Sequence, residues 1–562
     1  MIWFHPTCFR IFRATYEPSE EPSVKHLEVF AGATKPVYQP LCSEHEAAAS
    51  TLEGLLSKHT APIMQNCFSQ ELLERLPLEI LLMISELIGP CWYLTVLGES
   101  RRLIEHQIRD GEIQDPEVDI SRDVWMSRVN YRGNSYVVRL SNTPLKPTTS
   151  SRVSHVKLPR EIQKIVLSTD SIGLRGVQFL DDRATPTRDG SPWYEILDAQ
   201  HLPRKIHVNF DGLFVREVRL AACDSPSASI MWSSPYPPTF HSRNFYACRK
   251  KHRLHYMELG PQVQGLLVCS SAGQTIGIHA FSGTNKPFQD FLDSAHQRVK
   301  ESIKHWIYFP LNSNERISGA WVRKLKMCQG PAASPTLVLR TCLGRTVTFG
   351  TYFPSRITDQ LEYYALMSSY DGCVSGLFHD GFDPAYKFIS EYGVTCDDTD
   401  HSDISVPPPL HAELELPEIP PGRGSISSTW YMTKVSLRGL TKVQVCRDHA
   451  QAHQPYVGFL MFYEDGHMEA SGQIRWDYGL DDEVSCPVVV KQGVVGERGF
   501  IRDIRTARDN LESEAGPSVW QLPETGFIVW WFSHLGDMIE PSRSGIAMAR
   551  GLCFSSTNQR QP

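Results

Sequence analysis

From about residue 158 onward, the chain consists of short apolar segments separated by glycine, proline, asparagine and aspartate. The segment Val215–Leu220 intersperses apolar and charged residues, as a strand with one buried face does. Segments 162–167, 206–210 and 264–270 are equally short, and the first two contain several β-branched residues. A helix needs a longer apolar periodicity than any of these segments provides, so this texture predicts a β-rich body.

Pairs of these segments have the spacing of β-hairpins. Residues 337–341 and 346–349 flank the short connection 342–345, and residues 264–270 and 274–279 flank a Ser-Ala-Gly connection. The apolar run Tyr456–Tyr463 is followed by Asp465-Gly466, and Asp-Gly is a strong hairpin signal. We therefore expect antiparallel pairing within each of these regions.

Other segments break the β pattern. Residues 287–305 predict a helix, because Pro287 would stand in the first turn, where proline is tolerated. A further helix is predicted around Val124–Met126 and Val129, followed by a Ser/Thr/Pro-rich connector over residues 141–154.

An acidic and proline-rich segment, residues 397–424, predicts a linker. Its carboxylates at Asp397–Asp403 lack the glycine and closing glutamate of a calcium-binding loop, so no metal site is predicted. A chain of 562 residues is too long for one core. The predicted organisation is a segment over 1–66, a helical unit over 67–115, a helix and connector over 116–157, a β-rich region over 158–396, the linker over 397–424, and a second β-rich region over 425–562.

The N-terminal part carries a separate motif at Leu76–Ile88, after a predicted helix N-cap at Ser69. Apolar residues at positions 80, 84, 87 and 88 have the spacing of one helical face. Pro77 and Glu79 stand where a first helical turn tolerates proline and favours an acid.

This Leu-Pro-x-Glu-Ile pattern, followed by Leu94 and Ser100-Arg101, resembles the F-box. The resemblance implies docking to a Skp-type adaptor of a cullin-RING ubiquitin ligase, with no catalytic residue in the chain itself. The residues that would line this contact are Leu76, Pro77, Ile80, Ile84, Leu87 and Leu94. The chain departs from many F-boxes at residues 99–103, which lack a tryptophan, and at Gly89-Pro90, which ends the first helix early.

The opening of the chain, with His5 and Cys8 among aromatic residues, is similar to that of large fungal F-box proteins. Together these resemblances imply a substrate-recognition adaptor, in which the β-rich region selects a target for ubiquitination. The expected fold class is α+β, with a small N-terminal helical F-box-like unit followed by β-rich regions of sandwich or β-prism type.

Residues 309–394 weakly resemble β-prism lectins of the jacalin type, through Glu315-x-Ile317 and the segment from Leu337 to Arg345. Cys342 stands where those lectins usually carry asparagine, and Phe382-Asp383 is a candidate for their sugar-binding loop. Two alternatives to the adaptor therefore remain. One is a lectin-like carbohydrate-binding protein, and the other is a structural interaction protein whose F-box-like helix packs inside the fold.

Composition and motifs limit the remaining classes. The net charge of −7 with no long basic run gives no indication of nucleic acid or an anionic membrane as a partner. The 14 cysteines form no C-x-x-C pair and no signal peptide precedes them, which predicts reduced thiols in an intracellular protein, cytoplasmic or nuclear. No nucleotide-binding, hydrolase or metalloprotease motif occurs, so neither enzymatic activity nor a cofactor is predicted. His449 and His453 lie in a polar loop with no visible catalytic partner.

Overall fold

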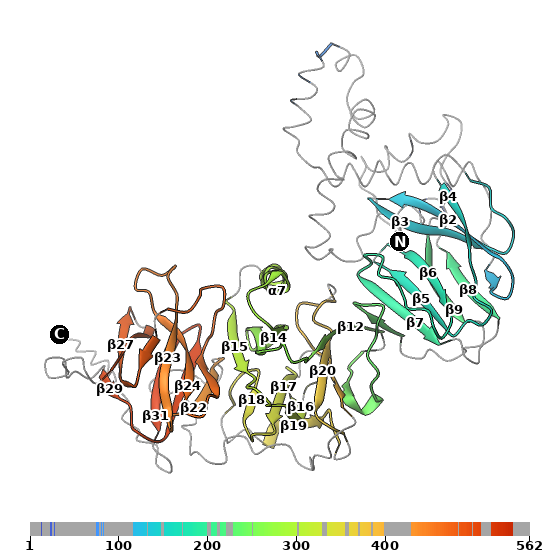
Figure 1. Cartoon of the computed structure of the whole chain (residues 1–562). Coiled ribbons are helices and arrows are strands. Elements are labelled where there is room, and N and C mark those ends of the chain that lie inside the picture. Colours follow the sequence, from blue (N-terminus) through green and yellow to red (C-terminus); the bar gives the residue numbers. More distant parts are fainter. Residues whose placement is uncertain are drawn as a thin grey trace. The chain divides into compact units, whose positions relative to one another are not determined.

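The computed structural model describes residues 116–397 and 429–542 with short gaps (Figure 1). It also describes a few residues nearer the N-terminus, namely Arg13, Ser23, Val24, Leu27, Arg75, Leu76, Pro77, Ile80 and Met83. The chain divides into two compact units. Unit 1 comprises residues 1–237 and 250–254, and unit 2 comprises residues 238–249 and 255–562.

The predicted α+β class is wrong. In the part of the chain that the structure describes, strands dominate, and α7 (Lys286–Arg298) is the only α-helix described over its full length, accompanied by one 3-10 turn, η1 (Ser242–Asn244). Ile80 and Met83 also have helical backbone. No N-terminal helical unit is seen there, because most of the predicted F-box-like unit at 67–115 lies outside the described residues. The β-rich prediction is confirmed. The apolar segments are short, and their backbone groups pair across strands.

The strands of unit 1 form small antiparallel sheets, with neighbours in the orders β1-β8-β9, β3-β2-β4 and β6-β5-β7-β10. Their bounds are β1 (Glu117–Asp119), β2 (Val124–Tyr131), β3 (Asn134–Ser141), β4 (Ser151–Val156), β5 (Lys164–Thr169), β6 (Leu174–Leu180), β7 (Trp193–Asp198), β8 (Lys205–Phe210), β9 (Val215–Leu220) and β10 (Ser229–Trp232). The first residues of β12 (Lys251–Glu258) also belong here and pair in parallel with β10. The main hydrophobic cluster of unit 1 is mostly aliphatic, and it includes Val118, Val124, Leu140, Ile165 and Ile206.

The helix predicted around Val124–Met126 and Val129 is wrong, because these residues form strand β2. A β-bulge between Ser127 and Arg128 explains the error. The bulge shifts the alternation of buried side chains, so that buried Met126 and Val129 lie three positions apart, as on a helix.

Unit 2 contains the remaining strands. The orders of its sheets are β14-β13-β15, β18-β17-β16-β19, β11-β21-β20 with the end of β12, β22-β30-β31, and β26-β23-β24-β28-β27-β29 with β25 beside β24. The bounds are β11 (Phe245–Tyr246), β13 (Gly265–Ser271), β14 (Gln274–Phe281), β15 (His305–Pro310), β16 (Ile317–Leu325), β17 (Thr336–Thr341), β18 (Thr346–Thr348), β19 (Leu361–Ala365), β20 (Val374–His379), β21 (Tyr392–Cys396), β22 (Tyr431–Ser436), β23 (Leu440–Arg447), β24 (Tyr456–Tyr463), β25 (Met468–Gly472), β26 (Glu483–Ser485), β27 (Pro487–Val495), β28 (Arg498–Thr506), β29 (Val519–Gln521), β30 (Phe527–Ser533) and β31 (Gly536–Ser542).

The three predicted hairpins are confirmed as the antiparallel pairs β13–β14, β17–β18 and β24–β25. The helix predicted at 287–305 is α7, which starts one residue earlier and ends at Arg298. Asn285 caps it by accepting a hydrogen bond from the Phe288 amide at 3.2 Å. His305 belongs instead to β15, in which every residue is buried and pairs with β13.

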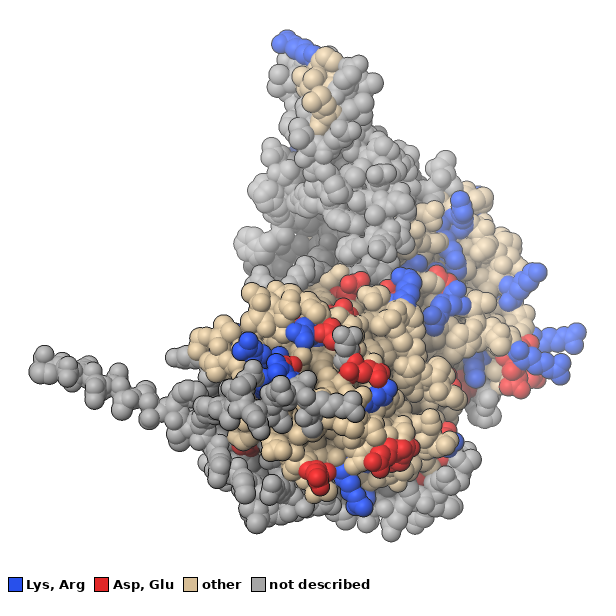
Figure 2. Space-filling model, turned by 60° about the vertical axis from the view of Figure 1, so that its left-hand side comes forward, with Lys and Arg blue, Asp and Glu red and all other residues tan. Residues whose placement is uncertain are grey.

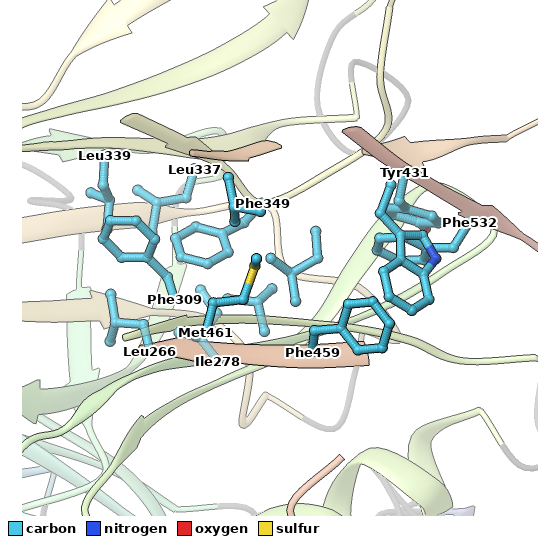
Figure 3. Packing of buried hydrophobic residues seen from close by; sticks show 14 of the residues in the cluster. Leu266, Ile278, Phe309, Leu337, Leu339, Phe349, Tyr431, Phe459, Met461 and Phe532 are labelled. Atoms are coloured by element: carbon cyan, nitrogen blue, oxygen red, sulfur yellow. The ribbon is translucent and has the colours of Figure 1, made fainter. Parts of the chain in front are cut away.

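One hydrophobic core joins residues from both sides of the predicted linker at 397–424 (Figure 3). Leu266, Phe309 and Leu339 precede that segment in sequence, whereas Phe459 and Phe532 follow it. The linker itself lies outside the described residues, apart from Asp397. Because these side chains share one core, the unit 2 strands before and after residues 398–428 fold as a single body.

Hydrogen bonds reinforce this shared core. Asn312 accepts a bond from the Met468 amide at 2.6 Å, and the amide of Trp306 donates to Gln473 Oε1 at 3.0 Å. The amide of Gly273, whose φ of +81° favours glycine, donates to the Tyr431 hydroxyl at 3.1 Å. On the face of the molecule in Figure 2, acidic and basic side chains are interspersed. No helix of the described residues is long and apolar enough to cross a membrane.

Candidate functional site

The predicted docking residues lie at the edge of what the structure describes. Leu76 is half-buried, Pro77 is exposed, and the Ile80 amide donates a hydrogen bond to the Pro77 carbonyl at 3.0 Å. Ile80 is 39% exposed, and its neighbour Met83 is 55% exposed. The other predicted docking residues, Ile84, Leu87 and Leu94, lie outside the described residues.

A second candidate site, which the sequence did not predict, is a cavity of about 620 Å³ in unit 2. We call it the His305 pocket. It is lined by Ile303, Lys304, His305, Asp448, Gln451, His453, Pro455, Val457, Gln473, Arg475, Tyr478, Val495, Arg498, Gly499, Phe500, Ser533, His534, Gly536 and Asp537. Its walls come from the start of β15, the β23–β24 loop, the chain after β25, the β27–β28 hairpin and the β30–β31 turn.

His305 is the most unusual residue of this pocket. The side chain is buried, with 5% of the residue exposed, and its ring stacks on Tyr431 with centroids 4.7 Å apart. Neither ring nitrogen makes a well-formed hydrogen bond, although the ring lies close to the backbone of Ser533. Burial lowers the pKa of His305 to about 4, so the ring is neutral near pH 7. Both ring nitrogens are shielded from solvent, so His305 is a buried polar group that the fold leaves largely unsatisfied.

Asp537 lies at the end of the β30–β31 hairpin, opposite Phe532 in the register. Burial raises the pKa of Asp537 to about 8, and a nearby Trp530 side chain only partly offsets this effect. The carboxyl group is therefore mostly protonated at pH 7 and can donate a hydrogen bond. Strongly shifted groups inside a cleft are typical of functional sites.

Replacing Asp537 by asparagine tests this assignment. A carboxyl group whose pKa is raised on folding stabilises most below its unfolded value of 3.8, and that stability is lost as the pH rises toward 8. Asparagine cannot ionise, so the melting temperature of Asp537→Asn should exceed that of the wild type at pH 8 and differ little at pH 4. The exposed Glu464, replaced by glutamine, is the control. An effect of Asp537→Asn that does not change with pH would contradict the raised pKa of this carboxyl group.

Arg475 is held inside the pocket by other side chains. Its guanidinium forms a two-point ion pair with Asp477, at 2.9 and 2.6 Å, and lies 4.1 Å from the ring centroid of Tyr478. The guanidinium also lies 5.1 Å from the Trp306 ring. These contacts hold the Arg475 side chain in one position and neutralise much of its charge.

The β23–β24 loop contributes ordered polar groups. Asp448 accepts hydrogen bonds from the Ala450 amide at 3.0 Å and from Gln451 Nε2 at 2.7 Å. The ring of His453 contacts Phe500 with centroids 4.5 Å apart. Of the two loop histidines noted in the sequence, His453 thus lines the pocket.

The second loop histidine, His449, does not line the pocket and contacts Asp481 instead. It is exposed, and its Nε2 lies 3.1 Å from Asp481.

Another cavity of unit 2, of about 370 Å³, is a weaker candidate. Its charged residues are engaged in the fold. Arg345 donates to Glu315, Pro310 and Met468, and Glu469 accepts from the Ser436 amide and the Tyr463 hydroxyl. Few polar groups remain for a ligand, so this cavity is better explained by the packing of the sheets.

A third cluster, around Arg249, is also structural. Arg249 donates to Asp380 and to Ser390, each at 2.7 Å, and Asp380 has no exposed side-chain surface. Asp380 further accepts from the amides of Ser390 and Glu391 at 2.9 and 3.2 Å. Every partner in this network is satisfied from within, which is how a buried charge is stabilised in a fold.

The lectin-like expectation at Phe382-Asp383 finds no support in the geometry. Asp383 is 3% exposed, and its carbonyl accepts a hydrogen bond from Arg298 at 2.9 Å. Phe382 packs against His255 with ring centroids 4.1 Å apart. A sugar could not reach the Asp383 side chain without a rearrangement of this loop.

No metal-binding group of three or more His, Cys, Asp or Glu side chains occurs among the described residues. The His305 pocket combines neutral donors, an ordered acid and cationic side chains, and this set is suited to holding a polar or charged ligand. No protein-family model matches the chain, and no curated protein resembles it closely enough to be matched.

Proposed function

We propose that this chain is a substrate-recognition adaptor of the F-box type. In this proposal, the motif that starts at Leu76 docks to a Skp-type adaptor of a cullin-RING ubiquitin ligase, and unit 2 selects the target. The chain supplies binding surfaces, and partner enzymes supply the chemistry of ubiquitin transfer.

The observation that carries the proposal is the exposure of apolar side chains within the motif. Ile80 and Met83 are 39% and 55% exposed, whereas most large apolar side chains of the described β-rich units are buried. Exposed apolar residues that are close together favour contact with a partner. The same exposure counts against a motif that merely packs inside the fold, which requires Ile80 to be buried.

The docking contact is tested by the substitution Ile80→Glu in the full-length chain. A contact that buries Ile80 gains about 25 cal/mol per Å² of apolar area, and a buried glutamate would lose this gain and require desolvation of a charge. We expect the affinity for a purified Skp-type adaptor to fall by at least about tenfold, or about 1.4 kcal/mol. Isothermal titration calorimetry measures this change directly.

The matched control is Val494→Glu, which introduces the same charge at a valine of unit 2 that is 54% exposed. This variant should bind the adaptor as the wild type does. Equal affinities for wild type and Ile80→Glu would rule out docking through this motif.

A further inference from the structure

The loop between β6 and β7 presents a Thr-Pro-Thr-Arg sequence, residues 185–188, to solvent. Thr185 and Arg188 are exposed, and Thr185 lies in neither a helix nor a strand. Proline restricts the residue before it to extended backbone, so Pro186 keeps Thr185 extended. The Thr185 hydroxyl makes no hydrogen bond with any residue that the structure describes. Its oxygen is therefore available to a reacting partner.

The residues next to Thr185 are held in place by side-chain hydrogen bonds. Thr187 donates to Gln178 Oε1 through its amide at 2.7 Å and through its hydroxyl at 3.0 Å. The Thr187 carbonyl accepts from Gln178 Nε2 at 2.8 Å. The Tyr236 hydroxyl donates to the Pro186 carbonyl at 2.6 Å. These contacts fix the shape of the loop and leave Thr185 itself at the surface of unit 1.

Two cations flank Thr185 without an acidic partner. Neither Arg183 nor Arg188 forms an ion pair with the described residues. The Arg188 guanidinium donates instead to the Ser234 hydroxyl, a neutral acceptor, at 3.1 Å. A hydrogen bond from a guanidinium to a phosphate is stronger than one to a neutral hydroxyl. A phosphate group on Thr185 would therefore compete with Ser234 for Arg188, which follows Thr185 by only three residues.

Thr143 begins the one other Ser-Pro or Thr-Pro pair of the described residues that has a basic residue at the third following position, Lys146. Thr143 is exposed too, but its hydroxyl lies 2.9 Å from the Ser141 hydroxyl, which also accepts from the Thr143 amide at 3.1 Å. Thr143 must lose the hydroxyl contact before it can react, whereas Thr185 has no such bond. The remaining pairs of the described residues lack the basic residue and begin at Ser191, Ser234 and Ser334.

We propose that Thr185 is a phosphorylation site for a proline-directed protein kinase, one that requires proline directly after the acceptor and prefers a basic residue two positions after that proline. Thr185 Oγ1 attacks the γ-phosphorus of ATP, the bond from that phosphorus to the bridging oxygen breaks, and ADP leaves. The hydroxyl proton passes to the catalytic aspartate of the kinase. The product carries about 1.5 to 2 negative charges at pH 7 beside Arg183 and Arg188. This inference goes beyond the adaptor proposal and does not depend on it.

Phosphorylation of the full-length protein tests this site, with a cyclin-dependent kinase as the probe and magnesium ATP as the donor. Mass spectrometry of the digested product identifies the residue that carries the phosphate. We expect Thr185 to be the main site, and total phosphate transfer to fall at least about tenfold in Thr185→Ala. Because the Thr185 hydroxyl makes no hydrogen bond in the described structure, Thr185→Ala should fold as the wild type does.

The basic residue gives a second readout. Arg188→Gln keeps the threonine and the proline but removes the charge, and it should lower kcat/KM for Thr185 at least about tenfold. The matched control Arg160→Gln removes an exposed arginine of unit 1 that does not follow a Ser-Pro or Thr-Pro pair, and it should react as the wild type does. Equal values of kcat/KM for Arg188→Gln and the wild type would overturn the proposed class of kinase.

A synthetic peptide with the sequence of residues 181–190 shows whether the fold presents Thr185 to a kinase. We expect both the peptide and the folded protein to be phosphorylated at this threonine. Phosphorylation of the peptide but not of the folded protein would overturn the proposal. Absence of transfer to both, or transfer confined to Thr143, would overturn it as well. Ile80→Glu should leave these rates unchanged, so the outcome is separate from that of the adaptor test.

Discussion

Replacing Arg345 by alanine is expected to destabilise unit 2 by about 3–5 kcal/mol, because it leaves a buried carboxylate without its cation. Arg345 forms a two-point ion pair with Glu315, at 2.8 and 2.6 Å, and the Glu315 side chain has no exposed surface. The same guanidinium donates to the carbonyls of Pro310 and Met468 at 2.5 and 3.2 Å. One side chain thus connects β15, the β17–β18 turn and the start of β25.

The pH dependence of this ion pair has a definite sign. Burial acts to raise the pKa of Glu315, but hydrogen bonds from Arg345 and Thr341 outweigh burial, and the pKa is lowered overall. A lowered pKa contributes stability above the unfolded value of 4.5, and that contribution is lost as the pH falls through the folded value. The difference in the free energy of unfolding between wild type and Arg345→Ala should therefore become smaller at acidic pH.

Urea denaturation combined with hydrogen exchange of peptides from unit 2 measures this effect, since exchange separates unit 2 from unit 1. The control Lys442→Ala breaks an ion pair with Glu483 at 3.0 Å in which both side chains are more than one third exposed. Exposed pairs contribute about 0–1 kcal/mol, so this variant should be near wild type. Equal losses in the two variants would contradict the role assigned to Arg345.

Replacing Trp530 by alanine should destabilise unit 2 by about 3–5 kcal/mol, the cost of deleting a large buried aromatic side chain. Trp530 is 0% exposed and meets Phe459 with ring centroids 4.9 Å apart. It also lies against Gly472, where a Cβ atom would approach the indole to 2.8 Å. The surroundings are strands held by their own hydrogen bonds, so they cannot collapse fully into the cavity.

The control is Trp125→Ala in unit 1, where the side chain is half-buried and packs on His155 at 5.0 Å. Trp125→Ala should lower the free energy of unfolding by less than half as much as Trp530→Ala. It should also leave the protection of β24 and β30 against hydrogen exchange unchanged. Because Trp530 belongs to the core that joins strands before and after residues 398–428, Trp530→Ala should expose β13 and β24 together. Loss of protection confined to β30 would contradict a single body.

Local sequence patterns predicted the hairpins because each hairpin depends on neighbouring residues. The Asp465-Gly466 turn and the connection at residues 342–345 bring together strands that adjoin in sequence. Local patterns gave wrong predictions where pairing with a distant strand decided the structure. The bulge in β2 gives its buried residues a spacing like that of a helix. His305 belongs to β15 rather than to α7 because it pairs with β13. The strands that pair with β2 and with β15 cannot be identified from the sequence of either segment alone.

The His305 pocket was beyond the reach of sequence patterns. His305, Arg498 and Asp537 come from strands far apart in the chain, and only the sheet topology of unit 2 brings them together. The polar loop containing His453 was the one sequence feature that pointed to this region, and no catalytic partner for this histidine was recognisable in the sequence. Gly499 and Gly536 likewise gave no indication of the pocket in the sequence, because their importance lies in the close approach of β28 and β31.

The measurement that tests the central proposal most directly is a calorimetric titration of the full-length protein with a purified Skp-type adaptor. We predict saturable binding with a dissociation constant of about 1 μM or tighter, and a negative heat-capacity change from burial of apolar surface. The affinity should fall by at least about tenfold in Ile80→Glu and stay unchanged in Val494→Glu. A folded wild-type protein that gives no saturable heat would contradict the adaptor function.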